Sequence, residues 1–393
     1  MSDVPVLPFQ QPNILEVAPR VRELQSHHPV TRVRTAVGDE AWLVTRHAYV
    51  SALLDDQRLG RSHPDPKRAA RTGNSALFGG AMGNTETEDA DHAHMRALLA
   101  PRFSARRMRA LAREVAGLVD RLLDDMEHAS RPLDLHEALA APLPVLLICR
   151  LLGVPPEDQN RFRSWSEGAG DTLDAQRSRQ SLAKLVGYMR ALVARKRADP
   201  GDDVLSELTT AHDGRLGDEH IAGLGAGLLF AGHETTMARI DLGAALVLSN
   251  LDQRDKLRDD PALIGSTVEE VLRSGGANGT GLPRYARTDM EIDGAEIRAG
   301  DAVVLDLAAA NHDPRVFPEP DRFDVTRAPN PHLTFGHGSR YCLGASLARI
   351  ELHAVFGELL QRFPSMRLAT PIERLRPRSG TLTGGFAELP VDW

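Results

Sequence analysis

The segment from residue 217 to about residue 250 constrains the fold more than any other part of the chain. If it is helical throughout, its roughly 33 residues run about 50 Å at 1.5 Å per residue, whereas an average helix has about 12 residues. Such a helix crosses the whole molecule. Its centre, LLFAGHETT, contains Gly232, which costs about 1 kcal/mol relative to Ala, and the β-branched Thr235 and Thr236. We therefore expect a local reason for this weakened centre.

The rest of the chain predicts a mainly α protein with small β-sheets, an α+β organisation. Apolar residues spaced three and four apart indicate amphipathic helices near residue 21 and over residues 106–126, 136–152 and 182–196. Two segments, 31–45 and 289–306, alternate around Gly38-Asp39 and Asp293-Gly294, and each is typical of a β-hairpin. Because the chain has no repeat and no long linker, we expect one domain over residues 1–393.

Composition argues against several classes of protein. Lys and Arg total 47 against 54 Asp and Glu, and the net charge of −7 gives no global basic field for nucleic acid. The N-terminal segment MSDVPVLPFQQPNILEV is broken by prolines and has no apolar run approaching the roughly 20 residues that span a bilayer. We expect a cytoplasmic protein with no membrane or nucleic-acid partner.

The two cysteines lie in different surroundings, so a disulfide framework is implausible. Cys149 lies in an apolar helical segment, where a free Cys is typically a small buried hydrophobe. Cys342 ends a glycine-rich loop, PHLTFGHGSRYC, just before an amphipathic helix that we expect to start near Leu343. The positive end of a helix and its free backbone N–H groups favour a thiolate, and Arg340 adds positive charge.

Cys342 could be a structural thiol, a nucleophile or a metal ligand. Glycines at 336, 338 and 344 let the backbone turn tightly and approach something flat, which a structural thiol does not need. A nucleophile needs a nearby base that this loop does not identify, and no second Cys lies near to complete a zinc or iron–sulfur site. The residues favour a single thiolate ligand to haem.

The loop resembles the signature of the cytochrome P450 family, Phe-x-x-Gly-x-(basic)-x-Cys-x-Gly, at Phe335, Gly338, Arg340, Cys342 and Gly344. The resemblance implies the cytochrome P450 fold, with the long central helix over haem b and the cysteine loop on its proximal side. Cys342 is then the axial iron ligand, and Phe335 and Gly336 lie against the cofactor. Many bacterial members have His where this chain has Arg340, so the charge is kept but the propionate contact can differ.

Further motifs occur in the order found in the family. Residues 231–235, AGHET, resemble the oxygen-activation motif, in which Gly232 and Thr235 open a groove for O2 and Thr235 and Glu234 relay protons. An ordinary cap or kink is the alternative for this motif taken alone. The resemblance also makes His92, Arg96, Arg284 and Arg340 contacts of the haem propionates.

Glu270 and Arg273 are three residues apart on one helix face and can pair. Alone, such a pair is usually a solvated surface pair. In the family it is a buried structural pair joined by an arginine of a later meander, and Arg322 is the expected third member.

The resemblance implies a haem-thiolate monooxygenase that hydroxylates or epoxidises a bulky, neutral secondary metabolite, such as a macrolide, polyketide or cyclic peptide. Oxidative C–C or C–N coupling without oxygen insertion is the alternative, and a haem-binding sensor or carrier without turnover is a remote one. The pocket is expected to be lined by residues 62–88, 228–232, 275–283 and 380–386. We expect a monomer that receives electrons from a ferredoxin and an NAD(P)H-dependent ferredoxin reductase, with Arg102, Arg106, Arg107 and Arg349 steering the acidic donor.

Overall fold

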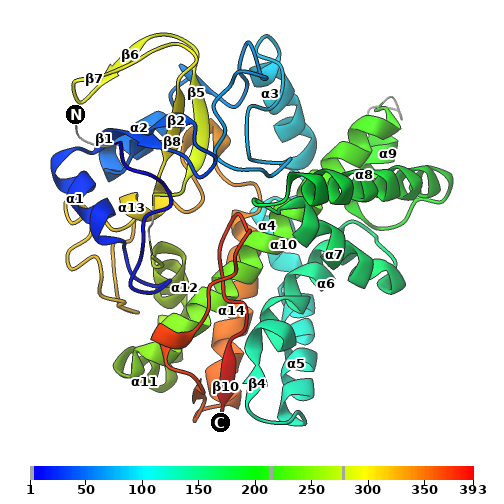
Figure 1. Ribbon diagram of the computed structural model, residues 1–393. Coiled ribbons are helices and arrows are strands. Elements are labelled where there is room, and N and C mark those ends of the chain that lie inside the picture. Colours follow the sequence, from blue (N-terminus) through cyan, green and yellow to red (C-terminus); the bar gives the residue numbers. More distant parts are fainter. Residues whose placement is uncertain (1–3, 212–215, 277–278) are drawn as a thin grey trace.

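The computed structural model describes residues 4–211, 216–276 and 279–393. Most of this chain is helical, and Figure 1 shows a helical part beside a smaller region that holds the largest sheet. The α-helices are α1 Pro19–His27, α2 His47–Leu54, α3 Glu88–Leu99, α4 Ala105–Ala110, α5 Ala112–Glu127, α6 Pro142–Leu151, α7 Gln159–Ala169, α8 Ala175–Ala198, α9 Val204–Thr210, α10 Asp218–Ser249, α11 Leu251–Asp259, α12 Ile264–Arg273, α13 Leu307–Ala310 and α14 Ala345–Arg362.

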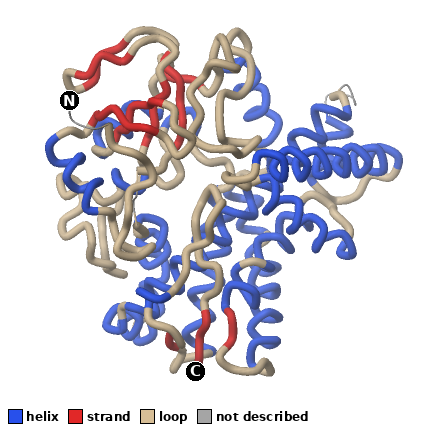
Figure 2. Tube along the Cα trace, in the orientation of Figure 1, coloured by secondary structure: helices blue, strands red, loops and turns tan. Residues whose placement is uncertain are grey.

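The strands form three small sheets. Their bounds are β1 Val30–Arg34, β2 Glu40–Val44, β3 Leu59–Gly60, β4 Leu133–Asp134, β5 Leu282–Ala286, β6 Met290–Ile292, β7 Ala295–Ile297, β8 Ala302–Leu305, β9 Arg367–Leu368 and β10 Pro390–Asp392. The largest sheet has the order β1-β2-β8-β5-β3, a second has the order β4-β10-β9, and β6 pairs with β7. Figure 2 shows the largest and second sheets at different ends of the molecule.

Both predicted hairpins are confirmed. β1 and β2 are antiparallel, with Val30 opposite Val44, and Gly38 between them has a φ of 96°. β6 and β7 turn at Asp293 and Gly294, whose φ angles of 52° and 76° give the left-handed pair that an Asp-Gly turn supplies. Local turn chemistry was therefore sufficient to predict these two pairings.

The long predicted helix is α10, a continuous 32-residue helix between its neighbours in the middle of the molecule (Figure 1). From Thr236 to Leu248 nearly every residue is buried, so this half is enclosed around its whole circumference and is mostly apolar, with Asp241 as a buried exception. Gly243 is required by close packing, because a Cβ there would overlap the Phe356 ring and lie 2.6 Å from Val271. α12 and α14 can therefore approach α10 closely.

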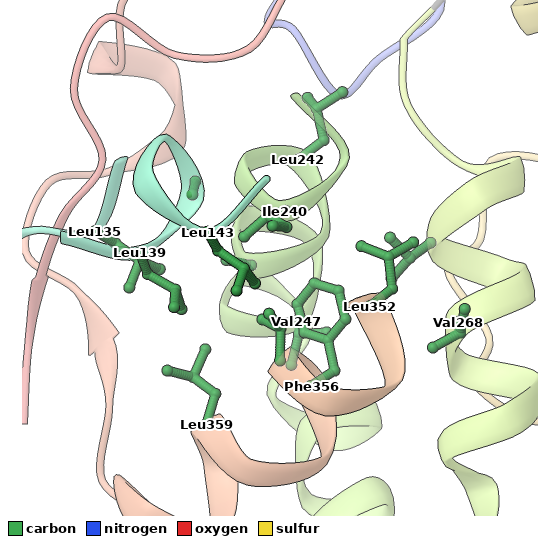
Figure 3. Close-up of a cluster of buried hydrophobic side chains, with 14 of the residues drawn as sticks. Leu135, Leu139, Leu143, Ile240, Leu242, Val247, Val268, Leu352, Phe356 and Leu359 are labelled. Atoms are coloured by element: carbon green, nitrogen blue, oxygen red, sulfur yellow. The ribbon is translucent and has the colours of Figure 1, made fainter. Parts of the chain in front are cut away.

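The main hydrophobic core forms where α10, α14, α12, α5 and the segment around residue 140 meet. Figure 3 shows Ile240 and Val247 of α10 among Leu139, Leu143 and Phe356. These side chains come from segments more than 200 residues apart in the chain. Their burial fixes α10 and α14 relative to each other, and α14 follows directly on the cysteine loop.

Some helix bounds differ from the predicted ones. The segment predicted as one helix over 106–126 is divided at Leu111 into α4 and α5. The segment 136–152 begins as a π-helical turn, His136–Ala140, before α6, where Pro142 and Pro144 cannot donate backbone hydrogen bonds. The predicted helix 182–196 is the centre of the longer α8, whose N-cap Asp174 accepts bonds from Gln176 N and Arg177 N. In the three described ranges, no helix is long and apolar enough to cross a membrane.

Candidate active site

The cysteine loop is a tight turn that leaves Cys342 exposed. The amide of Cys342 donates a 2.7 Å hydrogen bond to the carbonyl of buried Phe335, which closes the loop. Gly336 and Gly338 have φ angles of 73° and 67°, a conformation that other residues rarely adopt. A Cβ at Gly338 would also overlap Asp55. The predicted role of these two glycines in shaping the loop is therefore confirmed.

Cys342 as a residue is exposed, although protein surrounds most of its thiol. This enclosure raises the pKa of the thiol, while the amides of Gly344 and Ala345 and the charges of Arg96 and Arg349 oppose the rise. The predicted contribution of the helix N-terminus is therefore present, but it does not lower the pKa of the thiol overall. A metal ion at Sγ would supply the missing positive charge, because metal binding displaces the proton of a thiol.

Four of the predicted cofactor-binding residues gather beside this loop. Arg96 Nη1 donates a 2.7 Å bond to the carbonyl of Tyr341, which joins α3 to the cysteine loop. Burial and the charges of Arg340 and Arg96 lower the pKa of His92. Burial and the charge of Arg340 also act on Arg284 of β5, whose pKa falls to about 10. Arg96, Arg284 and Arg340 thus form one positively charged cluster, and His92 lies beside them with a pKa that favours its neutral form.

Arg284 shows that this cluster suits an anion. Arg284 is 7% exposed, and its Nη1 donates to the carbonyl of neighbouring Pro283 at 2.9 Å. In the described part of the chain, no carboxylate forms an ion pair with it. A buried guanidinium without an anionic partner is costly, so a carboxylate or similar ligand fits here.

Two members of the cluster were missed by the sequence reasoning. Arg61, after β3, is partly buried and lies over the Phe78 ring at 5.2 Å. Burial and the charge of Arg340 lower its pKa. Glu88 accepts bonds from the amides of Arg61 and Ser62 and from Arg340, so its carboxylate offsets part of the positive charge of Arg340. No local motif marks either residue, because the loop that brings them to Arg340 is long.

α10 has an accessible stripe at the middle of the molecule. Gly223, Gly227, Ala231 and Thr235 are exposed at intervals of four residues, while the residues on either side are mostly buried. Because positions four apart share one helix face, this stripe is one line of small side chains along α10. A helix enclosed by the fold exposes such a line where it borders open space.

The groove for O2 that was expected at Gly232 and Thr235 stays a prediction, but the structure shows how both residues pack. The helix is not interrupted at Gly232, where a Cβ would come within 3.2 Å of Ile148 in α6. Gly232 therefore serves close helix packing. Thr235 Oγ1 donates a 2.8 Å bond to the carbonyl of Ala231, one turn earlier.

Glu234 is held by the C-terminal loop. Its Oε1 accepts a 2.8 Å bond from the amide of Leu382 and a 3.3 Å bond from that of Thr383, and the side chain is 4% exposed. Burial raises the pKa of this carboxyl, and the two amides counteract part of that rise. The side chain can consequently hold a proton at a pH where an exposed Glu cannot.

The Glu270–Arg273 pair is buried, as expected, but its third member was predicted wrongly. Arg273 donates to Glu270 at 2.7 and 2.8 Å, and Arg327 Nε donates to the same carboxylate at 3.1 Å. Arg322 contributes only its carbonyl, and its exposed side chain pairs with Glu319. Residue 319 turns the chain with a φ of 47°, and Arg327 then reaches back to Glu270.

Comparison with known proteins identifies the family. The family model "Cytochrome P450" matches residues 262–374. Pentalenolactone synthase of Streptomyces exfoliatus is 47% identical over 397 residues and covers 100% of both chains. Mycinamicin IV hydroxylase/epoxidase of Micromonospora griseorubida is 40% identical over 391 residues and covers 98% of both. The substrate-free structure of PimD, a polyene macrolide antibiotic pimaricin epoxidase, has a TM-score of 0.90 at 42% identity, with 100% of both chains covered.

Members of this family bind haem b, and the residues present fit it. Cys342 is exposed, so its Sγ can ligate iron, and buried Arg284 has no carboxylate partner among the described residues, a place that a haem propionate would fill. The similarity extends over the whole sequence and the whole fold. The chain belongs to the cytochrome P450 family of haem-dependent monooxygenases.

Proposed function

We propose that residues 1–393 form a single haem domain in which Cys342 Sγ ligates the iron, and that the enzyme hydroxylates or epoxidises a bulky secondary metabolite. The observation that carries this proposal is the exposed Cys342 on a loop whose main chain requires glycine at 336 and 338. A structural cysteine needs neither property, as Cys149 illustrates: it is fully buried, and burial raises the pKa of its thiol to about 12.

The positively charged cluster orients the cofactor in this proposal. Arg284 of the sheet, Arg340 of the cysteine loop, and His92 and Arg96 of α3 would bind the propionates. Phe335 and Gly336 would contact the macrocycle, and Arg349 stacks over the Phe335 ring at 4.6 Å, which holds that ring in place. Arg61 adds a further cation that the signature motifs do not include.

Haem with a thiolate ligand supplies reductive activation of O2 and favours cleavage of its O–O bond. Insertion of one oxygen atom into the substrate and release of the other as water takes up two protons. We assign their delivery to Thr235 and Glu234. The Thr235 hydroxyl donates its hydrogen bond to the carbonyl of Ala231, so its oxygen lone pairs remain free to accept a hydrogen bond from water. Glu234 can hold a proton at its carboxyl, because burial raises its pKa. Gly232 keeps α10 close to Ile148 at this level.

The substrate pocket in this proposal lies between α10 and three loops. Phe78, in the loop before α3, contacts Phe230 of α10 with a centroid distance of 5.8 Å. Thr172 links two more segments, because its carbonyl accepts from Asn74 N at 3.0 Å and its amide donates to Gly380 O at 2.9 Å. Of the expected lining 275–283, residues 277 and 278 lie outside the described residues.

The size of the pocket occupant is inferred from this lining and from the relatives. Small and apolar residues along α10 and residues 380–386 leave room for a large neutral molecule. One relative is named a mycinamicin IV hydroxylase/epoxidase, and another an epoxidase of pimaricin, a polyene macrolide antibiotic. We therefore propose a macrolide, polyketide or cyclic peptide as substrate.

Electrons come, in this proposal, from a ferredoxin and an NAD(P)H-dependent reductase in the cytoplasm, and the enzyme works as a monomer. Among the arginines expected to steer the donor, Arg102 and Arg107 pair with Glu207, and Arg349 pairs with Glu269. Arg106 on α4 is exposed and forms no ion pair within the described ranges. Arg106 therefore offers the least compensated charge to an acidic partner.

Turnover under isotopic O2 tests the proposed reaction. Candidate macrolides and cyclic peptides are incubated with the enzyme, ferredoxin, reductase and NAD(P)H under isotopic O2, and the masses of the products are measured by mass spectrometry. Monooxygenation predicts one labelled oxygen atom in the product. An oxidised product without label would instead support C–C or C–N coupling, and binding of ligands with no oxidation of any would support a sensor or carrier.

A further inference from the structure

The C-terminal loop, residues 376–387, folds back on itself beside α10 (Figure 1). The amide of Arg378 in its first limb donates to the carbonyl of Gly385 in its second limb at 3.0 Å. Residues 380–386, which include the turn of the loop, belong to the expected lining of the pocket. The position of this loop therefore affects how closely the pocket can enclose a ligand.

Contacts along one face of α10 hold the C-terminal loop. Glu234 binds the turn of the loop through two amides, as described above. Arg378 Nη1 donates to Met237 Sδ at 3.3 Å. Near the end of the loop, a Cβ at Gly385 would lie 3.1 Å from Asp241 Oδ2, so the main chain passes close to this carboxylate. Positions 234, 237 and 241 are spaced three and four apart and share one helix face.

Asp241 also joins this face of α10 to a distant turn of the chain. Its Oδ2 lies 2.8 Å from Nδ1 of His136, in the π-helical turn before α6. Asp241 is fully buried, and His136 is 3% exposed. The other carboxylate oxygen, Oδ1, has no hydrogen-bond partner among the described residues. One oxygen of Asp241 therefore lies between His136 and the main chain of the C-terminal loop.

The turn that carries His136 is tied to the chain that follows the C-terminal loop as well. Asp134 Oδ1 accepts from the amide of His136 at 3.0 Å and from the amide of Leu389 at 2.8 Å. The amide of Leu135 donates to the carbonyl of Leu389 at 2.9 Å. A shift of His136 is therefore transmitted to the C-terminal loop both through Asp241 and through the chain at Leu389.

Both members of the His136–Asp241 pair carry charge over a range of pH. Burial lowers the pKa of His136, but the hydrogen bond and the charge of Asp241 outweigh burial and hold this pKa above its ordinary value of 6.5. The charge of Arg378 opposes that rise, and the charge of Glu137 adds to it. Burial raises the pKa of Asp241, and the hydrogen bond from His136 limits the increase. Between these two pKa values both side chains are charged.

Among the described residues, few other charges face His136. The buried side chains of α5 are apolar, and those of α6 are apolar apart from Cys149 near its end. His233 of α10 is neutral, because burial lowers its pKa to about 3. Arg163 of α7 donates to Glu137 at 2.5 Å, and Glu137 Oε1 lies 3.9 Å from His136 Nε2. Asp241 is therefore the close and buried partner of His136.

We propose that the ion pair between His136 and Asp241 positions the C-terminal loop and thereby determines how tightly the pocket holds a large ligand. This proposal rests on the haem site and the pocket of the proposed function. While the pair is charged, Asp241 stays in place against Gly385 and the loop stays close to α10. Without the charge of His136, the buried carboxylate lacks a counter-ion, and solvation of Asp241 favours movement of the loop away from α10. His136 is a positioning residue that does not touch the ligand.

The test uses the haem-loaded enzyme and two azoles that bind haem iron through an imidazole nitrogen. Imidazole is small, whereas clotrimazole carries bulky aromatic rings that would fill the pocket and reach the C-terminal loop. The dissociation constant of each azole is measured from the shift of the Soret band. Hydrogen exchange followed by mass spectrometry reports on the amides of residues 376–387.

The variants are His136→Leu, His136→Gln and Asp241→Asn, and the carbon monoxide difference spectrum first establishes that each holds haem normally. Lys196→Met is the matched control. Lys196 of α8 forms a pair at 2.6 Å with buried Asp203, just before α9, so the variant also loses a largely buried ion pair. Neither of these two residues belongs to the turn at His136 or to the C-terminal loop.

In His136→Leu and Asp241→Asn, the dissociation constant of clotrimazole should rise about tenfold, while that of imidazole should stay within about twofold. The amides of residues 376–387 should exchange faster in both variants. His136→Gln should keep most of the affinity, because its amide can donate to Asp241. The double variant His136→Gln/Asp241→Asn should bind clotrimazole no worse than Asp241→Asn alone, because both changes act on one pair.

The pH dependence separates the charge of the pair from its shape. At each pH, the clotrimazole affinity of the parent is divided by that of His136→Gln, which cancels the titration of the azole itself. The parent should have the advantage at about pH 6 and lose it as the pH rises through the pKa of His136, because the ring is then neutral, as Gln is. A ratio that does not change with pH would overturn the role of the charge, and this comparison decides the question even if His136→Leu does not fold.

The remaining outcomes distinguish this proposal from the proposed function. A parent protein whose Soret band shifts with neither azole would overturn both. A parent that binds both azoles, with normal clotrimazole binding and normal hydrogen exchange over residues 376–387 in His136→Leu, would overturn the positioning role and leave the haem site in place. Equal weakening in Lys196→Met would show that loss of any buried ion pair is sufficient, which also overturns the proposal.

Discussion

Replacing Glu270 by Ala should destabilise the protein far more than replacing Arg322, although sequence motifs place both in one structural unit. Glu270 is fully buried, and its carboxylate accepts bonds from Arg273, from Arg327, from the Asn330 amide at 3.1 Å and from Asp324 N at 3.0 Å. Its removal leaves the Arg273 guanidinium, which is 1% exposed, without an anion. Breaking such a buried pair costs about 3 to 5 kcal/mol.

That cost is a large part of the stability of a folded protein, which is about 5 to 15 kcal/mol. The Arg322 side chain is 50% exposed and its partner Glu319 is 72% exposed, so Arg322→Ala should cost no more than about 1 kcal/mol. Arg327→Ala should lie between the two, because Glu270 keeps Arg273. The carbonyl bonds from Arg273 to Asn311 and Pro320 also remain in all three variants.

Urea unfolding followed by circular dichroism, together with the haem content of the purified protein, measures these differences. The reasoning predicts the order Glu270→Ala, then Arg327→Ala, then Arg322→Ala in loss of unfolding free energy. A Glu270→Ala variant within about 1 kcal/mol of the parent would refute the assignment of a buried pair. Equal losses in Arg322→Ala and Arg327→Ala would refute the choice of Arg327 as its third member.

Three more changes have definite expected results. Thr235→Ala should retain haem but divert NAD(P)H electrons to hydrogen peroxide, and unchanged coupling would remove Thr235 from proton delivery. Glu351→Gln should stabilise the protein above pH 4.5, because burial raises the pKa of Glu351 well above its unfolded value of 4.5. Between those two pKa values the native state keeps a proton that the unfolded state releases, so the unfolding free energy of the parent falls by up to about 1.4 kcal/mol per pH unit as the pH rises. Parallel curves of unfolding free energy against pH for parent and variant would contradict this. Arg106→Glu should slow reduction by ferredoxin more than Arg107→Glu, most strongly at low salt, and equal stopped-flow rates for both variants would argue against docking at α4.

Turn residues, glycines and helical spacing in the sequence predicted the structure correctly where that structure depends on residues close together in the chain. The Asp293-Gly294 turn, the glycines before Cys342 and the length of α10 all follow from residues close together in the chain. That Glu270 and Arg273 can pair follows from their spacing on one helix, whereas their burial was implied by the family resemblance. Each of these predictions needed no knowledge of distant segments.

Features that join distant segments were not accessible in this way. β4 pairs with β10 across more than 250 residues, and strands of two or three residues leave no clear alternating pattern. Arg61 enters the charged cluster through a long loop, and the tie between Glu234 and Leu382 spans 148 residues. Arg327, and not the expected Arg322, is the third member of the Glu270–Arg273 cluster, because the turn at residue 319 changes the direction of the chain. Tertiary packing decided all of these cases.

Thiolate ligation by Cys342 is the central claim, and the absorbance difference spectrum of the dithionite-reduced protein with and without carbon monoxide tests it most directly. The parent protein should show a strongly red-shifted Soret band, and Cys342→Ala should lose that band while Cys149→Ala keeps it. A parent protein that binds no haem, or a band that stays where a His-ligated haem absorbs, would contradict the account.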